Sequence, residues 1–113
     1  RTKRIPNHHE VIGYQADMGK GWWGSLYDES RRRTVLSKAD PAVIEKILKP
    51  DQWNRYEIRC EGKRIRLFIN GTQTIDYTEP DPKIPVEGVI AVQIHGGPPS
   101  EAWYRNIRLA PLP

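Results

Sequence analysis

The sequence predicts an all-β fold, a sandwich of short antiparallel strands with one short helix. Several runs alternate apolar and polar residues with period two, which is typical of strands with one buried face. Ten prolines and nine glycines favour tight turns between such strands. At 113 residues the chain is long enough for one domain or part of one.

Composition excludes several classes of protein. No apolar run approaches the roughly 20 residues of a membrane-spanning helix. The 18 Lys and Arg residues are interspersed with 14 Asp and Glu residues, which indicates a mixed, solvated surface and argues against a nucleic-acid partner. Cys60 is the single cysteine, so the chain can form neither an internal disulfide nor a cysteine zinc site.

The clearest segment is a β-meander between Trp53 and Tyr77. Three strand-like runs are separated by the pairs Glu61-Gly62 and Asn70-Gly71. Asn-Gly between apolar runs is a strong hairpin signal, because a type I′ turn needs positive φ at both central residues. The apolar positions of the first two runs share one face of each strand: Tyr56, Ile58, Cys60, Ile65, Leu67 and Ile69.

Two further strands are expected after the meander, at 88–95 and 102–109. Each alternates apolar and polar positions, and the turn-rich segment Gly96 to Ser100 separates them. They would complete an inventory of about seven antiparallel strands.

Before the meander we expect strands at 11–17 and 22–27 and a helix at 41–48. Asp40 is placed as the N-cap and Pro41 at the first helical position, while Pro50 lies just beyond the end. No strand is expected ahead of 11–17, so one sheet is predicted to have an uncovered edge.

Motifs along nearly the whole chain resemble the 3-keto-disaccharide hydrolase family. Several motifs in the family's order are more specific than any one of them alone. They are His9 to Gly19, Gly21 to Glu29, Trp53-Asn54-Arg55-Tyr56-Glu57-Ile58, Phe68-Ile69-Asn70-Gly71, Gln93-Ile94-His95-Gly96-Gly97 and Tyr104-Arg105-Asn106-Ile107.

This resemblance implies a concanavalin A-like jelly roll with a concave sugar-binding face. It also implies a bacterial protein exported to the periplasm or the extracellular space. Family domains carry strands ahead of the position that matches Arg1, so the chain is expected to be the C-terminal portion of a single such domain, 1–113.

The chemistry implied by the resemblance is cleavage of a glycoside whose C3 hydroxyl has been oxidised to a ketone. The ketone acidifies the C2 proton, so a general base can remove it while a cation or hydrogen-bond donor holds the enolate oxygen. The C1 substituent then leaves by β-elimination, and water can add afterwards.

The resemblance assigns proton transfer to His95 together with Glu10 or Asp17, because histidine is a natural acid or base at neutral pH. Arg31 is expected to hold the enolate, with Trp23 rather than Trp22 in the groove. The expected substrate-binding residues are Gln15, Trp23, Tyr27, Glu29, Arg31 and Gln93.

Two questions stay open at this point. A divalent cation at His9 and Glu10 is one alternative, although adjacent strand residues point to opposite faces and limit how many ligands can converge; no cofactor is certain. The expected partner is a small carbohydrate, but a non-catalytic lectin-like or laminin-G-like module would use the same residue types.

Overall fold

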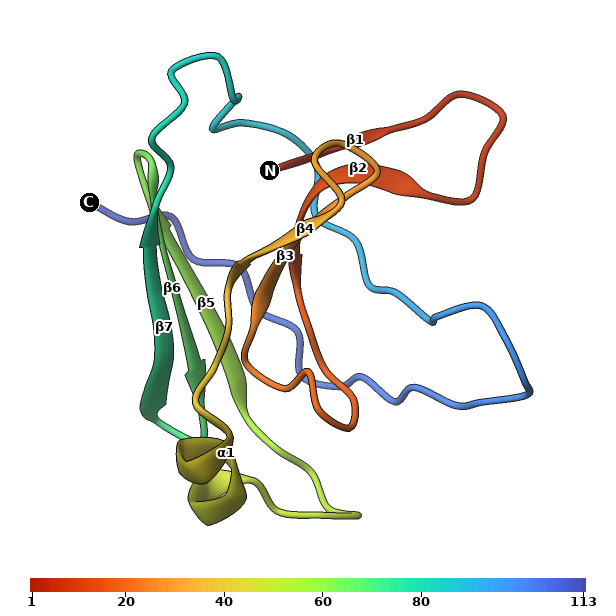
Figure 1. Cartoon of the computed structure of the whole chain (residues 1–113), viewed down its shortest axis with the longest axis vertical. Helices are drawn as coiled ribbons and strands as arrows, with labels where there is room; N and C mark the ends of the chain where they lie inside the picture. Colours follow the sequence, from red (N-terminus) through yellow and green to blue (C-terminus); the bar gives the residue numbers. More distant parts are fainter.

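Two antiparallel sheets and one short helix make up the computed structural model, which describes residues 1–113 (Figure 1). Every strand pairs with its neighbour in the sequence, so each sheet is a simple meander. The first sheet contains β1 (Thr2–Arg4), β2 (Val11–Ala16), β3 (Leu26–Glu29) and β4 (Thr34–Ser37). The second contains β5 (Tyr56–Glu61), β6 (Arg64–Ile69) and β7 (Thr72–Thr78), and α1 (Pro41–Ile47) connects the two.

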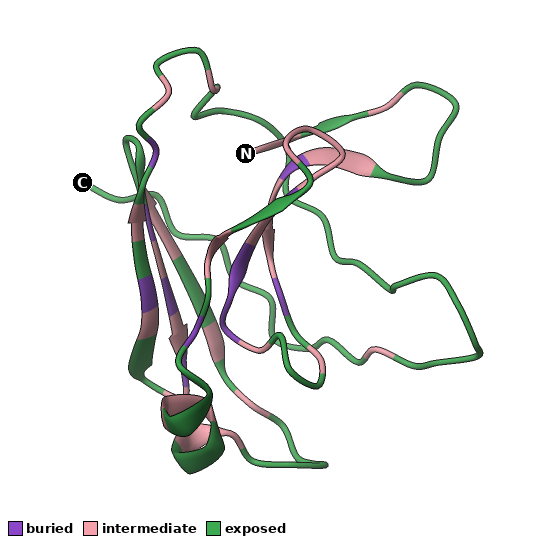
Figure 2. Cartoon of the chain, in the orientation of Figure 1, coloured by how far each residue is buried: buried purple, intermediate pink, exposed green.

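The two sheets bury a small apolar core between them, as expected for a β-sandwich. Leu26 from the first sheet packs with Ile65, Leu67 and Ile75 from the second, and Ala39 joins them from the segment before α1. Figure 2 shows buried residues concentrated on β3, β6 and β7. The prediction of an all-β sandwich with one short helix is therefore confirmed.

The predicted meander and helix are also confirmed, although Ile58 on the apolar face of β5 is 57% exposed. The turn between β6 and β7 has φ of 50° at Asn70 and 86° at Gly71, as a type I′ hairpin requires. A side-chain oxygen of Asp40 accepts a hydrogen bond from the Ala42 backbone N–H at 2.9 Å, which caps α1. With seven residues, α1 is far too short to cross a bilayer, and the structure contains no other helix.

The prediction of two strands near the C-terminus is wrong. Residues 90–113 make no backbone–backbone hydrogen bond, and only an isolated bridge between Thr2 and Val89 joins the start of this segment to β1. Its apolar side chains remain in solvent: Ile90 is 71% exposed and Leu109 is 78% exposed. Alternation reports which side chains could share a face, but a strand also needs a hydrogen-bonded neighbour.

The N-terminal half departs from expectation in two places. A strand missed in the sequence, β1, pairs with β2 and covers the edge that was predicted to be open. The expected strand at 22–27 begins only at Leu26, because Trp22 and Trp23 lie in a turn closed by hydrogen bonds to the Gly19 carbonyl at 2.9 and 3.2 Å.

The register of β2 and β3 determines which residues share the outer face of the first sheet. Tyr14 lies opposite Asp28, and both point toward the core side. Because successive strand residues alternate between faces, the next pair, Gln15 and Tyr27, points the other way. The candidate site is built on this second face.

Candidate functional site

Four of the expected site residues share the outer face of the β2–β3 hairpin. Gln15 is directly opposite Tyr27 in the register, and Glu29 follows two residues after Tyr27 on the same face. Asp17, two residues after Gln15, extends this row just past the end of β2. Directly opposed strand residues hold their Cβ atoms about 5 Å apart, so these side chains are neighbours.

Hydrogen bonds to its backbone fix the position of Asp17. Its N–H donates to the Ser25 carbonyl at 3.0 Å, and its carbonyl accepts from the Gly24 N–H at 3.1 Å. The Tyr56 hydroxyl, from the second sheet, donates to the same carbonyl at 3.0 Å. The chain around Asp17 is therefore fixed by both strand pairing and contact between the sheets.

The Asp17 carboxylate is buried without a cation in contact. The side-chain amide of Gln15 donates to it, and no arginine or lysine forms a salt bridge with it. Burial raises the pKa of this carboxyl group above its ordinary value, and the nearby charge of Glu29 raises it further. The Gln15 hydrogen bond and the charges of Lys38 and His95 lower the same pKa, but burial prevails.

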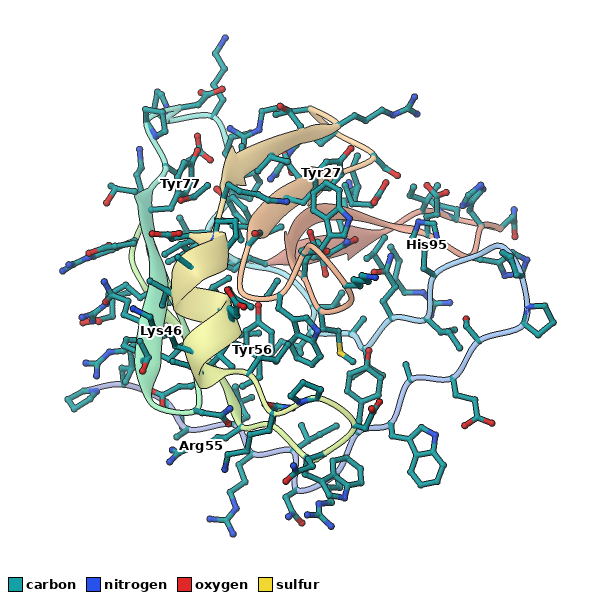
Figure 3. The ribbon with its side chains drawn as sticks, turned by 60° about the horizontal axis from the view of Figure 1, so that its bottom comes forward. Tyr27, Lys46, Arg55, Tyr56, Tyr77 and His95 are labelled. Carbon is teal, nitrogen blue, oxygen red and sulfur yellow. The ribbon has the colours of Figure 1, made fainter.

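His95 approaches this row from the C-terminal segment. Its side chain is exposed, and its Nδ1 lies 2.5 Å from the Gly96 carbonyl. No hydrogen bond joins it to Asp17, but a charge on the His95 ring lowers the pKa of that carboxyl group. Figure 3 shows His95 on the C-terminal segment and Tyr27 on the first sheet, while Tyr56 and Tyr77 belong to the second. An imidazole and a buried carboxylate in one neighbourhood can transfer protons.

A comparison with protein families identifies the family of the chain. The model of the 3-keto-alpha-glucoside-1,2-lyase-like domain matches residues 1–110. The chain belongs to this family. Membership confirms the resemblance in the sequence motifs and supports a carbohydrate-related function. No curated protein and no solved structure is significantly similar to the chain.

Glu10 and His9 lie at the opposite end of β2 from Asp17. Glu10 and Asp17 flank the six residues of β2 at its two ends, seven positions apart, a span of roughly 23 Å at about 3.3 Å per strand residue. A Glu10 carboxylate oxygen accepts a hydrogen bond from the Ser30 hydroxyl at 2.5 Å. The structure brings together no group of three or more His, Cys, Asp or Glu residues with the geometry of a metal site.

Arg31 belongs to the opposite, core-facing side of the sheet. Its guanidinium forms a salt bridge with the buried Asp28 carboxylate at 2.7 Å and lies over the Tyr14 ring, 5.0 Å from its centroid. Tyr27 and Glu29 point away from that side. The structure therefore does not bring Arg31 together with the Asp17 row.

The two tryptophans differ in exposure and in their contacts. Trp22 is the more exposed ring, and the Lys38 ammonium group lies 3.9 Å from its centroid. Trp23 is half-buried and stacks against Tyr56, with the ring centroids 6.4 Å apart. Gln93 is exposed on the C-terminal segment, and its carbonyl accepts a hydrogen bond from the Tyr104 hydroxyl at 2.5 Å.

Lys38 is the residue near Asp17 that sequence reasoning missed. Its ammonium group donates to the Gly21 carbonyl at 2.7 Å, which places it beside the turn that carries the two tryptophans. It follows β4, a strand that the alternation of the sequence did not reveal. With β4 unrecognised, nothing in the sequence placed this lysine next to β3.

Proposed function

We propose that this domain cleaves 3-keto-glycosides by base-assisted elimination, with Asp17 as the general base. The carboxylate removes the C2 proton of the sugar, and the electron pair of that C–H bond moves toward the C3 carbonyl to form an enolate. Collapse of the enolate forms a double bond between C1 and C2 and expels the C1 substituent with its electron pair. Water can then add to the product.

The position of Asp17 is the observation that carries this proposal. A general base works best when its pKa approaches the working pH, and burial moves the pKa of Asp17 in that direction. Glu10, the other carboxylate considered, accepts from Ser30 at the far end of β2. Asp17 is therefore favoured over Glu10.

The remaining groups have supporting roles in the proposal. His95 supplies a second proton-transfer group from the C-terminal segment, and its charge lowers the pKa of Asp17. Gln15 holds the carboxylate through its amide and so fixes the orientation of the base. Tyr27 and Glu29 are the groups on the same face that can contact the sugar ring and its hydroxyls.

Turnover of a 3-keto-disaccharide by the purified chain tests the proposal. Wild-type protein should release a product from the keto sugar and leave the unoxidised disaccharide intact. Asp17→Asn should lose at least about 100-fold in turnover, which is the lower end of what a general base contributes. Glu10→Gln is the matched control, a carboxylate at the other end of the same strand, and should retain turnover.

Two outcomes would reject this assignment. Equal turnover by wild type and Asp17→Asn would remove Asp17 from the chemistry. Binding of the unoxidised glycan without cleavage of either sugar would favour a lectin-like module, which has the same kind of sheet face but no use for a base.

A further inference from the structure

A pocket of about 410 Å³ lies between the turn after β2 and the helix α1. Its size falls within the range of roughly 300–1,000 Å³ that is typical of small-molecule sites. Trp23 contributes an indole ring to its wall, Ile44 and Pro41 contribute aliphatic groups from the helix, and Lys20 and Lys38 lie at its boundary. The expected site residues, other than Trp23, lie outside this pocket.

Direct bonds connect the pocket to Asp17. Ser25, which lines the pocket, accepts the hydrogen bond of the Asp17 backbone N–H at 3.0 Å. Trp23 stacks on Tyr56, whose hydroxyl donates to the Asp17 carbonyl at 3.0 Å. Residues that line the pocket therefore contact the backbone of the proposed base directly or through Tyr56.

Lys38 connects the two places electrostatically. It lines the pocket, its ammonium group is fixed by the Gly21 carbonyl, and its charge acts on the Asp17 carboxylate. Lys20, the second lysine at the pocket, forms no hydrogen bond or salt bridge in the structure and is exposed. The pocket is therefore lined by two lysines and one acidic residue, Glu45, together with aromatic and aliphatic groups.

We propose that this pocket binds the leaving group of the substrate and selects 3-keto-glycosides with an aromatic aglycone. The inference rests on the proposed function and adds the substrate class. An apolar cavity of only about 150 Å³ can hold a benzene molecule, so a pocket of this size has ample room for a phenyl group or a larger aromatic system. Trp23 offers such a ring a stacking partner.

The charges at the pocket suit the chemistry of an aryl leaving group. When the bond between C1 and the glycosidic oxygen breaks, its electron pair stays on that oxygen and the aglycone departs as a phenolate. Lys38 lines the pocket, and its ammonium group, held by the Gly21 carbonyl, would stabilise this developing negative charge. The phenolate then takes up a proton from solvent.

Kinetics with two aglycones test the selectivity. The full chain is assayed with 4-nitrophenyl and methyl 3-keto-glucosides, and the ratio of the two kcat/KM values is determined for each protein. The ratio of a variant is then compared with that of wild type. The intrinsic reactivity of the two leaving groups is the same for both proteins, so it drops out of this comparison. Trp23→Leu should lower the aryl-to-methyl ratio about three- to tenfold, the range expected for loss of an aromatic contact. Trp103→Leu, an exposed tryptophan on the C-terminal segment, should leave the ratio unchanged.

Binding of the free aglycone by the wild-type chain provides a test that needs neither turnover nor a variant. Titration with 4-nitrophenol should shift the NMR signals of the Trp23 indole and of the Ser25 and Ile44 amides, whereas methanol should not. Shifts without turnover of either glycoside would support the pocket and reject the proposed function. Turnover with an unchanged ratio in Trp23→Leu and no such shifts would overturn the pocket while leaving the proposed function standing.

Discussion

The phenolic hydroxyl of Tyr14 donates a hydrogen bond of 2.6 Å to a carboxylate oxygen of Glu79, and this bond joins β2 in the first sheet to the residue that follows β7 in the second. Arg32 donates to both carboxylate oxygens of Glu79, at 3.0 and 2.8 Å, and its guanidinium also bonds to Asp28. Glu79 and Asp28 are both buried, so the sandwich is held partly by a charged network and not by apolar contact alone.

Glu79→Gln should destabilise the fold by about 3 kcal/mol, because loss of one buried partner leaves the Arg32 charge without full compensation. Urea unfolding of the two proteins at pH 7 measures the difference. Asp76→Asn is the control, since Asp76 forms its salt bridge with Arg64 on the exposed surface, and its effect should be much smaller. Equal effects of the two substitutions would show that the buried network does not stabilise the sandwich.

The same network predicts how stability depends on pH. The hydrogen bonds from Arg32 lower the pKa of Glu79 from 4.5 to about 2. A carboxylate with a lowered pKa in the folded state stabilises that state fully above pH 4.5, and this contribution is lost as the pH falls from 4.5 toward 2. The difference in unfolding free energy between wild type and Glu79→Gln should shrink across that window. A difference that stayed constant down to pH 2 would contradict the assignment.

Asp17→Asn should raise stability at pH 7 while it removes activity. Burial raises the pKa of Asp17, so the ionised form is unfavourable in the folded protein, and a neutral amide of similar shape relieves that cost. The carbonyl oxygen of the new side chain can still accept from Gln15. Thermal unfolding should show a higher melting temperature at pH 7, and the gain should vanish at low pH, where wild-type Asp17 is itself protonated. A lower melting temperature at pH 7 would mean that the carboxylate stabilises the fold.

His95→Gln should shift the acid limb of the kcat/KM profile to higher pH. The charge of His95 lowers the pKa of Asp17, so its removal lets that pKa rise and a higher pH is then needed to ionise the base. The profile is measured with a 3-keto-glycoside for wild type and variant. Lys38→Met should shift the limb in the same direction, whereas a shift to lower pH in either variant would contradict the proposed electrostatic role.

Asn70→Ala should cost about 2–3 kcal/mol of stability, because Asn70 combines a left-handed backbone with several side-chain hydrogen bonds. Its φ is 50°, its side-chain oxygen accepts from the Arg55 N–H at 2.9 Å, and its amide donates to the Ile47 carbonyl at 2.8 Å. Asn70→Gly keeps the backbone freedom and loses only the side-chain bonds, so it should cost less. Equal losses in urea unfolding would show that the backbone conformation is not strained for alanine.

The sequence predicted the parts of the fold that depend on local chemistry. The meander follows from the Asn70-Gly71 turn and from the alternation on either side of it, and α1 follows from its Asp40 cap. The segments 88–95 and 102–109 alternate equally well, but pairing depends on which distant segment lies beside them. Only the three-dimensional arrangement supplies that information, as the single bridge between Thr2 and Val89 illustrates.

Only part of the candidate site could be predicted, because the rest depends on which distant segments lie side by side. The expected strand at 11–17 contains both Gln15 and Asp17, but the expected strand at 22–27 ends before Glu29. The observed register places Tyr27 and Glu29 on the same face as Gln15. Arg31 could not be placed in this way, since Ser30 has φ of 54° and the chain turns before the arginine. The burial that raises the pKa of Asp17 depends on packing of the surrounding chain, which no residue pattern reports.

Exchange of the C2 proton tests the central claim, that Asp17 removes this proton, most directly. A 3-keto-glucoside is incubated in D₂O with wild-type protein or with Asp17→Asn, and loss of the C2 proton signal is followed by NMR together with formation of product. The account predicts that wild type removes the C2 proton and that Asp17→Asn does so at least about 100-fold more slowly while it still binds the sugar. Exchange or elimination at the wild-type rate in Asp17→Asn would contradict it.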